Sequence, residues 1–352
     1  MNIFSKIKLP LGKEKFSIGL DIGTQSIKCV KLKITNGAEL MGFDLEEGQL
    51  NPAEVLKKIK HAQDADLVNI SFCGSSTVIR YVNFLRMNKD EFKQSLKFEA
   101  QKHIPFSLNE VNLDAEILKN DLPENKMLVM IAAIKKEAMQ QRLKVLEEAG
   151  LRPDIIDIDS VALINAFNFN YPKVDVAEGK SICLLNIGAT ISNVSILENG
   201  IPRLSRDIHN AGANFTKKLM DIFDLDFKAA EKLKIEGSGL ALDSQSQNPD
   251  PQRANKVKAS VESVLTNLAQ EIRTSFDYYE SQNSSNVAKI FLSGGGSKIT
   301  GLAEMLASCL GIAVESWDAF KQVKISSNLD AQRLNSFCGQ FNVALGLALR
   351  ER

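Results

Sequence analysis

The pattern of hydrophobic and polar positions repeats between the two halves of the chain. The stretch "FSIGLDIGTQSIKCVKLKITNG" begins at Phe16, and "SICLLNIGATISNVSILENG" begins at Ser181. Each has an apolar run, an acid or amide, Ile-Gly, a small polar patch, a second run and Asn-Gly. Alternating runs predict strands, and Asn-Gly between two such runs predicts a hairpin turn. We therefore predict a related β-hairpin unit in each half.

The spacing between the two copies is nearly constant. Asp21 corresponds to Asn186, 165 positions later, and Asn36 corresponds to Asn199, 163 positions later. Helical periodicity follows the strands in both halves, most clearly over residues 251–281. The pattern predicts a duplicated α/β fold, and a cleft between duplicated halves is a common ligand site.

The domain boundaries follow from the repeat. We expect a first domain over residues 16–170 and a second over 171–352. Residues from about 65 to 120 have no counterpart in the second half, so they are predicted to form an inserted subdomain. Residues 1–15 are lysine-rich and are predicted to be a flexible basic segment. Contact of this segment with an anionic membrane is left open.

Composition excludes several classes of protein. Lys+Arg and Asp+Glu both number 43, so a broad nucleic-acid footprint is not expected. The five cysteines form no CxxC pair and the three histidines lie far apart, which disfavours a zinc site. No apolar stretch approaches the roughly 20 residues that a membrane helix needs. These features predict a cytoplasmic protein.

Three glycine turns follow apolar strands and are the candidate ligand-binding segments. They are "DIGTQS" at 21–26, "NIGAT" at 186–190 and "SGGGS" at 293–297. Glycine lets backbone N–H groups approach an anion without a Cβ in the way. Asp21 could hold Mg²⁺, which prefers one or two carboxylates together with phosphates and water. Neither a Walker A loop nor a GxGxxG fingerprint is present.

In this order, the three turns resemble the phosphate-1, phosphate-2 and adenosine motifs of the actin/Hsp70/sugar-kinase superfamily. More specifically, "KFEAQKHIPFSLNEVNLDAEIL", "LSRDIHNAGANFT" and "KIFLSGGGSKITGLAEML" resemble the PilM family of type IV pilus assembly proteins, which are relatives of the cell-division protein FtsA. The resemblance spans residues 16–350. It implies duplicated actin-like (ribonuclease H-like) domains that flank a nucleotide cleft, with an inserted α+β subdomain in the first half.

The resemblance implies ATP and Mg²⁺ as cofactors, with Asp21 at the metal. The segment "AEKLK" resembles the superfamily helix that touches the nucleoside. The nucleotide-binding residues expected from the three turns and this helix are Asp21, Gly23, Thr24, Gln25, Ser26, Lys28, Asn186, Gly188, Ala189, Thr190, Glu231, Lys234, Gly294, Gly295, Gly296 and Ser297.

Asn186 departs from the family pattern, which usually has Asp at this position. An amide keeps the shape and an acceptor oxygen but lacks the charge that attracts Mg²⁺. Because hydrolysis gains most from charge preorganised around the phosphoryl group, we expect nucleotide binding with slow or absent turnover. The protein would be at most a slow ATPase, and no catalytic residue is assigned. The alternative, that Asn186 lies outside the metal shell, stays open.

The resemblance also implies a partner. A PilM-like adaptor would bind the N-terminal cytoplasmic peptide of a PilN-like membrane protein and would lie, through its partners, at the cytoplasmic face of the inner membrane. A homo-oligomer is left open. The residues expected to form the peptide surface, in or beside the inserted subdomain, are Phe98, Ile104, Pro105 and Phe106.

Two other function classes stay open at this stage. A small-molecule kinase of the same superfamily would need a catalytic aspartate, and Asp157, Asp159 and Asp207 are available. An FtsA-like filament former would be expected to end in a membrane helix, which the chain lacks after "GLALRER".

Overall fold

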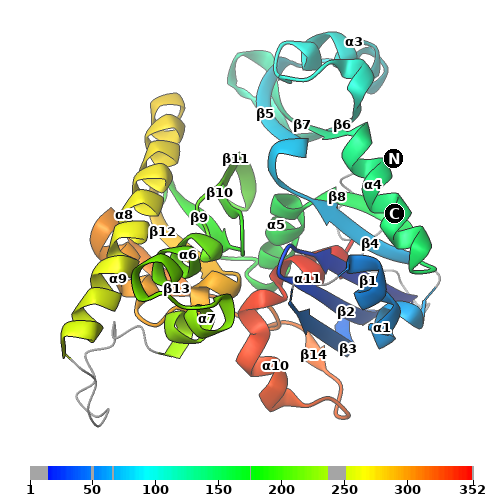
Figure 1. Ribbon diagram of the computed structural model, residues 1–352. Coiled ribbons are helices and arrows are strands. Elements are labelled where there is room, and N and C mark those ends of the chain that lie inside the picture. Colours follow the sequence, from blue (N-terminus) through cyan, green and yellow to red (C-terminus); the bar gives the residue numbers. More distant parts are fainter. Residues whose placement is uncertain (1–14, 49–50, 66, 175, 237–250, 351–352) are drawn as a thin grey trace. The chain divides into compact units, whose positions relative to one another are not determined.

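The computed structural model describes residues 15–48, 51–65, 67–174, 176–236 and 251–350. The predicted basic segment therefore lies outside the described residues except for Lys15. The chain forms two compact units (Figure 1). The first comprises Met1–Lys173, Gly200–Ser205 and Ala319–Arg352, and the second comprises Val174–Asn199 and Arg206–Asp318. The C-terminal residues thus belong to the first unit, whereas the sequence pattern grouped them with the second half.

A six-stranded sheet organises the first unit. Its order is β14-β3-β2-β1-β4-β8. The pairs β1–β2 and β2–β3 are antiparallel, as the alternating runs predict, while β4 is parallel to both β1 and β8. The strands are β1 (Lys15–Ile22), β2 (Ser26–Ile34), β3 (Ala38–Glu47), β4 (Leu67–Phe72), β8 (Arg152–Ile158) and β14 (Lys324–Ile325).

A separate three-stranded antiparallel sheet, of order β5-β7-β6, forms the inserted subdomain. Its strands are β5 (Thr77–Leu85), β6 (Val111–Leu122) and β7 (Lys126–Lys135), and it carries α3 (Lys89–Gln101). Asn88 and Glu91 form a capping box that starts α3. The subdomain begins later and ends later than residues 65–120, because β4 pairs with the main sheet and β7 is the central strand here.

Helices complete the first unit: α1 (Pro52–Lys58), α2 (Lys60–Gln63), α4 (Lys136–Glu148), α5 (Asp159–Asn170), α10 (Ala331–Phe337) and α11 (Asn342–Ala348). The periodicity over residues 330–349 predicts one helix. The structure instead has two, because the backbone tightens into a 3₁₀ turn at Cys338–Gln340.

Helix α11 packs so closely on its neighbours that side chains are excluded at two points. A Cβ on Gly346 would lie 1.8 Å from the carbonyl oxygen of Ala162 in α5. A Cβ on Gly19 in β1 would lie 1.9 Å from the carbonyl oxygen of Ala344. Both distances are below any real contact, so these glycines are required by packing.

A buried ion pair joins the end of β8 to Arg350, two residues beyond α11. Arg350 Nε lies 2.9 Å from Asp157 Oδ2, and both side chains are almost fully buried. Burial raises the pKa of Asp157 to about 6, and the charge of Arg350 opposes that rise. A carboxylate held in this way is a structural group.

The second unit repeats the hairpin arrangement. Its sheet order is β11-β10-β9-β12-β13, in which β9 and β10 are antiparallel and β12 is parallel to β9. Among the described residues, no helix is both long enough and apolar enough to cross a membrane. The elements are β9 (Lys180–Ile187), β10 (Ser192–Glu198), β11 (Ile201–Ile208), β12 (Asn286–Ser293), β13 (Ala313–Ser316), α6 (Gly212–Phe223), α7 (Phe227–Glu236), α8 (Pro251–Gln282) and α9 (Leu302–Leu310). Strand β11 belongs to this sheet, although its first part falls in the segment Gly200–Ser205 that is grouped with the first unit.

We predict that Gly346→Ala destabilises the protein, because the new methyl group would overlap the Ala162 carbonyl. Overpacking of this kind costs about 1–3 kcal/mol. Gly37→Ala is the matched control, because no atom lies within 4 Å of the place that a Cβ on Gly37 would take. Thermal unfolding followed by circular dichroism checks the pair, and equal melting temperatures would contradict the packing argument.

Candidate functional site

The first glycine turn joins β1 to β2 with its backbone exposed. The N–H of Gly23 donates to the carbonyl oxygen of Ser26 at 3.0 Å and closes the turn. The carbonyl of Gln25 accepts from the N–H of Gly48 at 2.9 Å, which fixes the far side. Gly23 and Thr24 are exposed, while Gln25 and Ser26 are half-buried. The turn therefore presents a supported backbone at the surface of its unit.

Asp21 and Lys28 face each other at the base of this turn. They are directly opposed in the β1–β2 register, and Lys28 Nζ lies 2.9 Å from Asp21 Oδ2. The expected Mg²⁺ ligand is thus already paired with a cation. Across the described residues, no group of three or more His, Cys, Asp or Glu could hold a metal. One carboxylate fits only a Mg²⁺ that arrives with phosphates and water as its other ligands.

Arg142 in α4 supports the same turn from inside, and the sequence did not single it out. Its Nη1 donates to the carbonyl oxygen of Ile22 at 3.3 Å, and its guanidinium lies 5.3 Å from the ring centre of Phe72. Burial lowers the pKa of Arg142, while Asp159 and Asp21 act against that shift. A positive charge therefore lies behind the first turn.

The second glycine turn is held by the start of α6. Gly188 N–H donates to Ile191 O at 2.9 Å and closes the β9–β10 hairpin. The N–H groups of Gly212 and Ala213 then donate to the carbonyls of Gly188 and Ala189 at 3.0 and 2.7 Å. These two N–H groups of the helix start are therefore already bonded to the turn. Gly212 was not among the expected site residues, although it lies in the quoted "NAGANFT".

The third turn crosses the end of β9 at very short range. Gly294 has φ 89°, and a Cβ there would lie 2.3 Å from the carbonyl oxygen of Ile187. A Cβ on Gly296 would meet the side chain of Ile187 at the same distance. Ser297 Oγ donates to Gly294 O at 2.6 Å, while Gly295 is exposed. The second and third turns therefore meet at Ile187.

A row of polar side chains crosses four strands beneath these two turns. Ser293, Asn186 and Asn193 are register partners on β12, β9 and β10. Ser293 Oγ donates to Asn186 Oδ1 at 3.2 Å, and Asn186 Nδ2 donates to Asn193 Oδ1 at 3.2 Å. Asn193 Nδ2 donates to Asp207 Oδ1 of β11 at 2.5 Å. Asn186 is thus one member of a continuous hydrogen-bonded chain.

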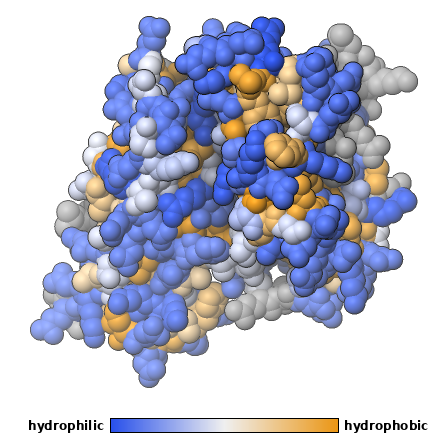
Figure 2. Space-filling view, turned by 90° about the horizontal axis from the view of Figure 1, so that it is seen from above, coloured by the Kyte–Doolittle hydropathy of each residue, from blue (hydrophilic) through white to orange (hydrophobic). Residues whose placement is uncertain are grey.

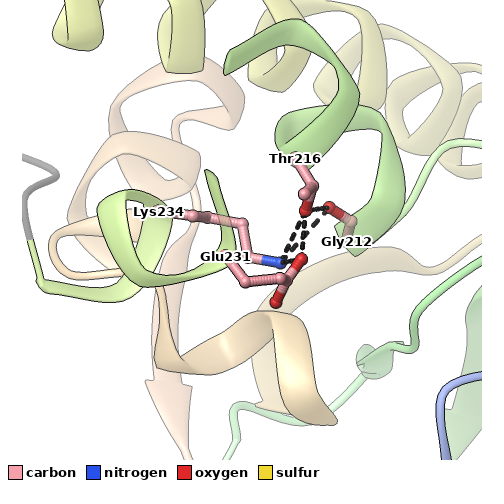
Figure 3. A network of polar contacts seen from close by, with 4 residues as sticks. All are labelled: Gly212, Thr216, Glu231 and Lys234. Carbon is pink, nitrogen blue, oxygen red and sulfur yellow. Dashed lines mark hydrogen bonds and ion pairs between the residues drawn. The ribbon is translucent and has the colours of Figure 1, made fainter. Parts of the chain in front are cut away.

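Glu231 and Lys234 form a compact network with α6 (Figure 3). Lys234 Nζ lies 2.5 Å from Glu231 Oε1 and 2.9 Å from Thr216 Oγ1, and it reaches the carbonyl of Gly212 at 3.5 Å. Thr216 Oγ1 also bonds Glu231 Oε1. Lys234 is only 6% exposed, so its charge is compensated within the unit. Through Gly212, the network also supports the second turn.

The four expected partner residues differ in exposure. Ile104 is buried in the core of the inserted subdomain, whereas Phe98 is 67% exposed. Pro105 is exposed and Phe106 is half-buried. Figure 2, seen from the side on which α3 lies in Figure 1, shows apolar atoms exposed among polar ones.

Two lysines sit over the aromatic rings of this surface. Lys102 Nζ lies 4.7 Å from the ring centre of Phe98, and Lys135 Nζ lies 4.5 Å from that of Phe106. Cation–π contacts of this kind keep an exposed ring in one place. Lys102 is also ion-paired with Glu99 at 2.8 Å, so aromatic rings and charges of both signs lie side by side here.

Comparison with known proteins places the chain in a family. The family model described as "Type IV pilus assembly protein PilM" matches residues 19–352. A solved structure titled "PilM-PilN type IV pilus biogenesis complex" contains a chain with 26% identity and a TM-score of 0.80. The match covers 95% of this chain and 98% of that one.

A second solved structure shares the fold at lower identity. It is the ethanolamine utilization protein EutJ from Carboxydothermus hydrogenoformans, with 14% identity and a TM-score of 0.51. The match covers 95% of this chain and 89% of that one. The chain has the actin-like α/β fold that the family resemblance implies.

We predict that Lys234→Met lowers stability by about 1–3 kcal/mol, because Glu231 and Thr216 lose a buried charged partner. Lys228→Met is the control, since Lys228 is exposed on the same helix. Chemical denaturation measures both variants. Equal unfolding midpoints for the two would show that the buried amine contributes nothing.

Proposed function

Because the chain belongs to the PilM family of type IV pilus assembly proteins, we propose that it is a nucleotide-binding adaptor of a pilus assembly machine or of a related secretion or competence machine. It binds ATP through its glycine turns and the N-terminal cytoplasmic peptide of a PilN-like membrane protein through its inserted subdomain. The single observation that carries the assignment is the near full-length match to a chain of a PilM–PilN complex.

The two hairpin turns support nucleotide binding. Each has a closed, glycine-containing backbone at the end of a buried strand. Lys28 supplies a cation at the first turn, and Arg142 adds a second positive charge behind it. Phosphate oxygens are well matched by exposed backbone N–H groups next to a lysine. Mg²⁺ would enter with the phosphates and use Asp21, where it would neutralise phosphate charge.

The geometry around Asn186 favours binding over hydrolysis. The amide is occupied on both sides, by Ser293 and by Asn193. A metal near the phosphoryl group would have no charged ligand at position 186. Hydrolysis would suffer from this, because preorganised charge is the largest contribution to phosphoryl transfer. The nucleotide then acts as a conformational ligand, which shifts the protein between states according to its differential affinity for them.

Among the carboxylates considered for a kinase, Asp157 does not suit a catalytic base. It is fully buried against Arg350 and has no access to a substrate. The adaptor function needs no such base.

The inserted subdomain supports peptide binding. Phe98 is a large aromatic side chain left exposed on α3, with Pro105 and Phe106 on the segment that follows. Aromatic side chains, phenylalanine among them, are enriched at protein–protein interfaces. Ile104 contributes by supporting the surface from the core. Binding to a membrane-anchored partner would keep the adaptor at the cytoplasmic face of the inner membrane.

We predict that wild-type protein binds Mg·ATP and that Lys28→Met weakens the binding at least about tenfold, because a charge-assisted hydrogen bond contributes about 1.5–3 kcal/mol. Isothermal titration calorimetry measures both affinities. The control is Lys31→Met on the same strand, which removes an ion pair with Asp64 instead.

Absence of heat from wild-type protein at millimolar Mg·ATP would refute nucleotide binding. Equal affinities for the Lys28 and Lys31 variants would show that ATP does not use the first turn.

We predict that Phe98→Ala weakens binding of a PilN-like N-terminal peptide at least about tenfold without changing the melting temperature, because an anchor residue contributes about 2 kcal/mol or more. Tyr278→Ala is the control, since Tyr278 is also an exposed aromatic residue, 60% exposed, on α8. Fluorescence anisotropy of the labelled peptide measures the affinities. If the two variants bind alike, the peptide site lies elsewhere.

A further inference from the structure

The polar row across β11, β10, β9 and β12 has a direction. A carboxylate only accepts hydrogen bonds, whereas an amide has one donor end and one acceptor end. Asp207 therefore takes the N–H of Asn193, which turns the oxygen of Asn193 toward Asn186. The amide of Asn186 must then donate to Asn193 and present its own oxygen to Ser293.

The end of this row reaches both glycine turns of the second unit. Asn186 is followed by Ile187 and Gly188, and Ser293 is followed by Gly294. A Cβ on Gly294 would lie 2.8 Å from Asn186 Oδ1, which shows how closely the third turn passes this oxygen. The orientation of the Asn186 amide thus decides which atom faces the third turn.

Two members of the row are buried, whereas Asn186 and Asp207 are half-buried. Asn193 is 2% exposed and Ser293 is 0% exposed. The neighbouring residue Arg206 faces the other way, toward Ser275 and Glu271 of α8. Strand alternation therefore places Asp207 on the face of the polar row.

From this geometry we propose that Asp207 is a positioning residue of the second glycine turn. Its carboxylate, acting through Asn193, sets the orientation of the Asn186 amide, and it holds on β11 the negative charge that an aspartate at position 186 would place on β9. This inference rests on the proposed nucleotide binding for its functional part and on the hydrogen-bonded row for its structural part.

The proposal explains why an acid at position 186 conflicts with the present row. With carboxylates at both 186 and 207, the amide nitrogen of Asn193 could donate to only one of them. The amide oxygen would then face the other carboxylate, and neither group would have a hydrogen to donate. Two acceptors opposed at the buried side chain of Asn193 leave an unsatisfied group. Moving the acid from 207 to 186 removes the conflict, because the row then simply reverses its direction.

The test is a double-mutant cycle on the full chain with Asn186→Asp, Asp207→Asn and the two combined. We expect Asn186→Asp to lower the melting temperature by several degrees and Asp207→Asn to lower it less. The combined variant should recover most of the loss, because the row is satisfied again. Asp277→Asn, an exposed change on α8, is the control for removal of a charge. Additive single effects would overturn the row as the structure presents it.

A second readout separates charge position from stability. ATP affinity is measured by calorimetry in the presence of Mg²⁺ and in the presence of EDTA. The ratio of these two affinities is then compared between wild type and the combined variant. Since the acid now lies on β9 beside the second turn, we expect the Mg²⁺-dependent gain to increase about tenfold. An unchanged ratio would overturn the role of Asp207 in placing the charge.

The two failures can be told apart. Wild-type protein that binds no ATP under either condition refutes the proposed function and with it the nucleotide role of Asp207. The melting temperatures of the cycle then still decide whether Asp207 orients Asn186.

Discussion

The second unit depends on backbone segments that approach one another at Ile187–Ala189 more closely than side chains allow. The third turn passes over Ile187 at Gly294 and Gly296, and the start of α6 contacts the second turn at Gly212. Because these contacts are made by main-chain atoms, glycine is needed for packing whether or not a ligand binds. The two helix N–H groups bonded to the turn carbonyls are no longer available, so a phosphate would have to bind the turn itself.

Charges near the glycine turns are compensated by the protein's own groups. Lys28 is paired with Asp21, and Lys234 with Glu231. A phosphate that attracts Lys28 would therefore weaken its bond to Asp21. The carboxylate released in this way becomes able to bind a cation. Metal and phosphate binding at the first turn are thus expected to be linked, with each favouring the other.

The strands were predictable because they are encoded locally. Period-two alternation and Asn-Gly turns predict both hairpins, and the hairpin register alone would have placed Asn193 opposite Asn186. Arg142 could not be found this way, because its position depends on how α4 packs on the sheet. Asp207 was considered from the sequence only as a kinase base, although β11 follows β10 across the Asn199-Gly200 turn. The prediction of a single helix over residues 330–349 was wrong. Helical periodicity continues through Cys338–Gln340, but the backbone there tightens into a 3₁₀ turn that separates α10 from α11.

The position of the acid relative to the second turn bears on what a nucleotide would do. Asp207 is linked to the turn through Asn193 and Asn186, so the side chain of Asn193 separates its carboxylate from Asn186 on β9. A carboxylate at that distance can orient an amide, but it cannot ligate a metal at the turn or organise an attacking water as a residue on β9 would. Binding energy is then available for changing conformation and little of it for hydrolysis. This arrangement suits the proposed adaptor function, because the carboxylate of Asp207 orients Asn193 and Asn186 instead of lying on β9 beside the second turn.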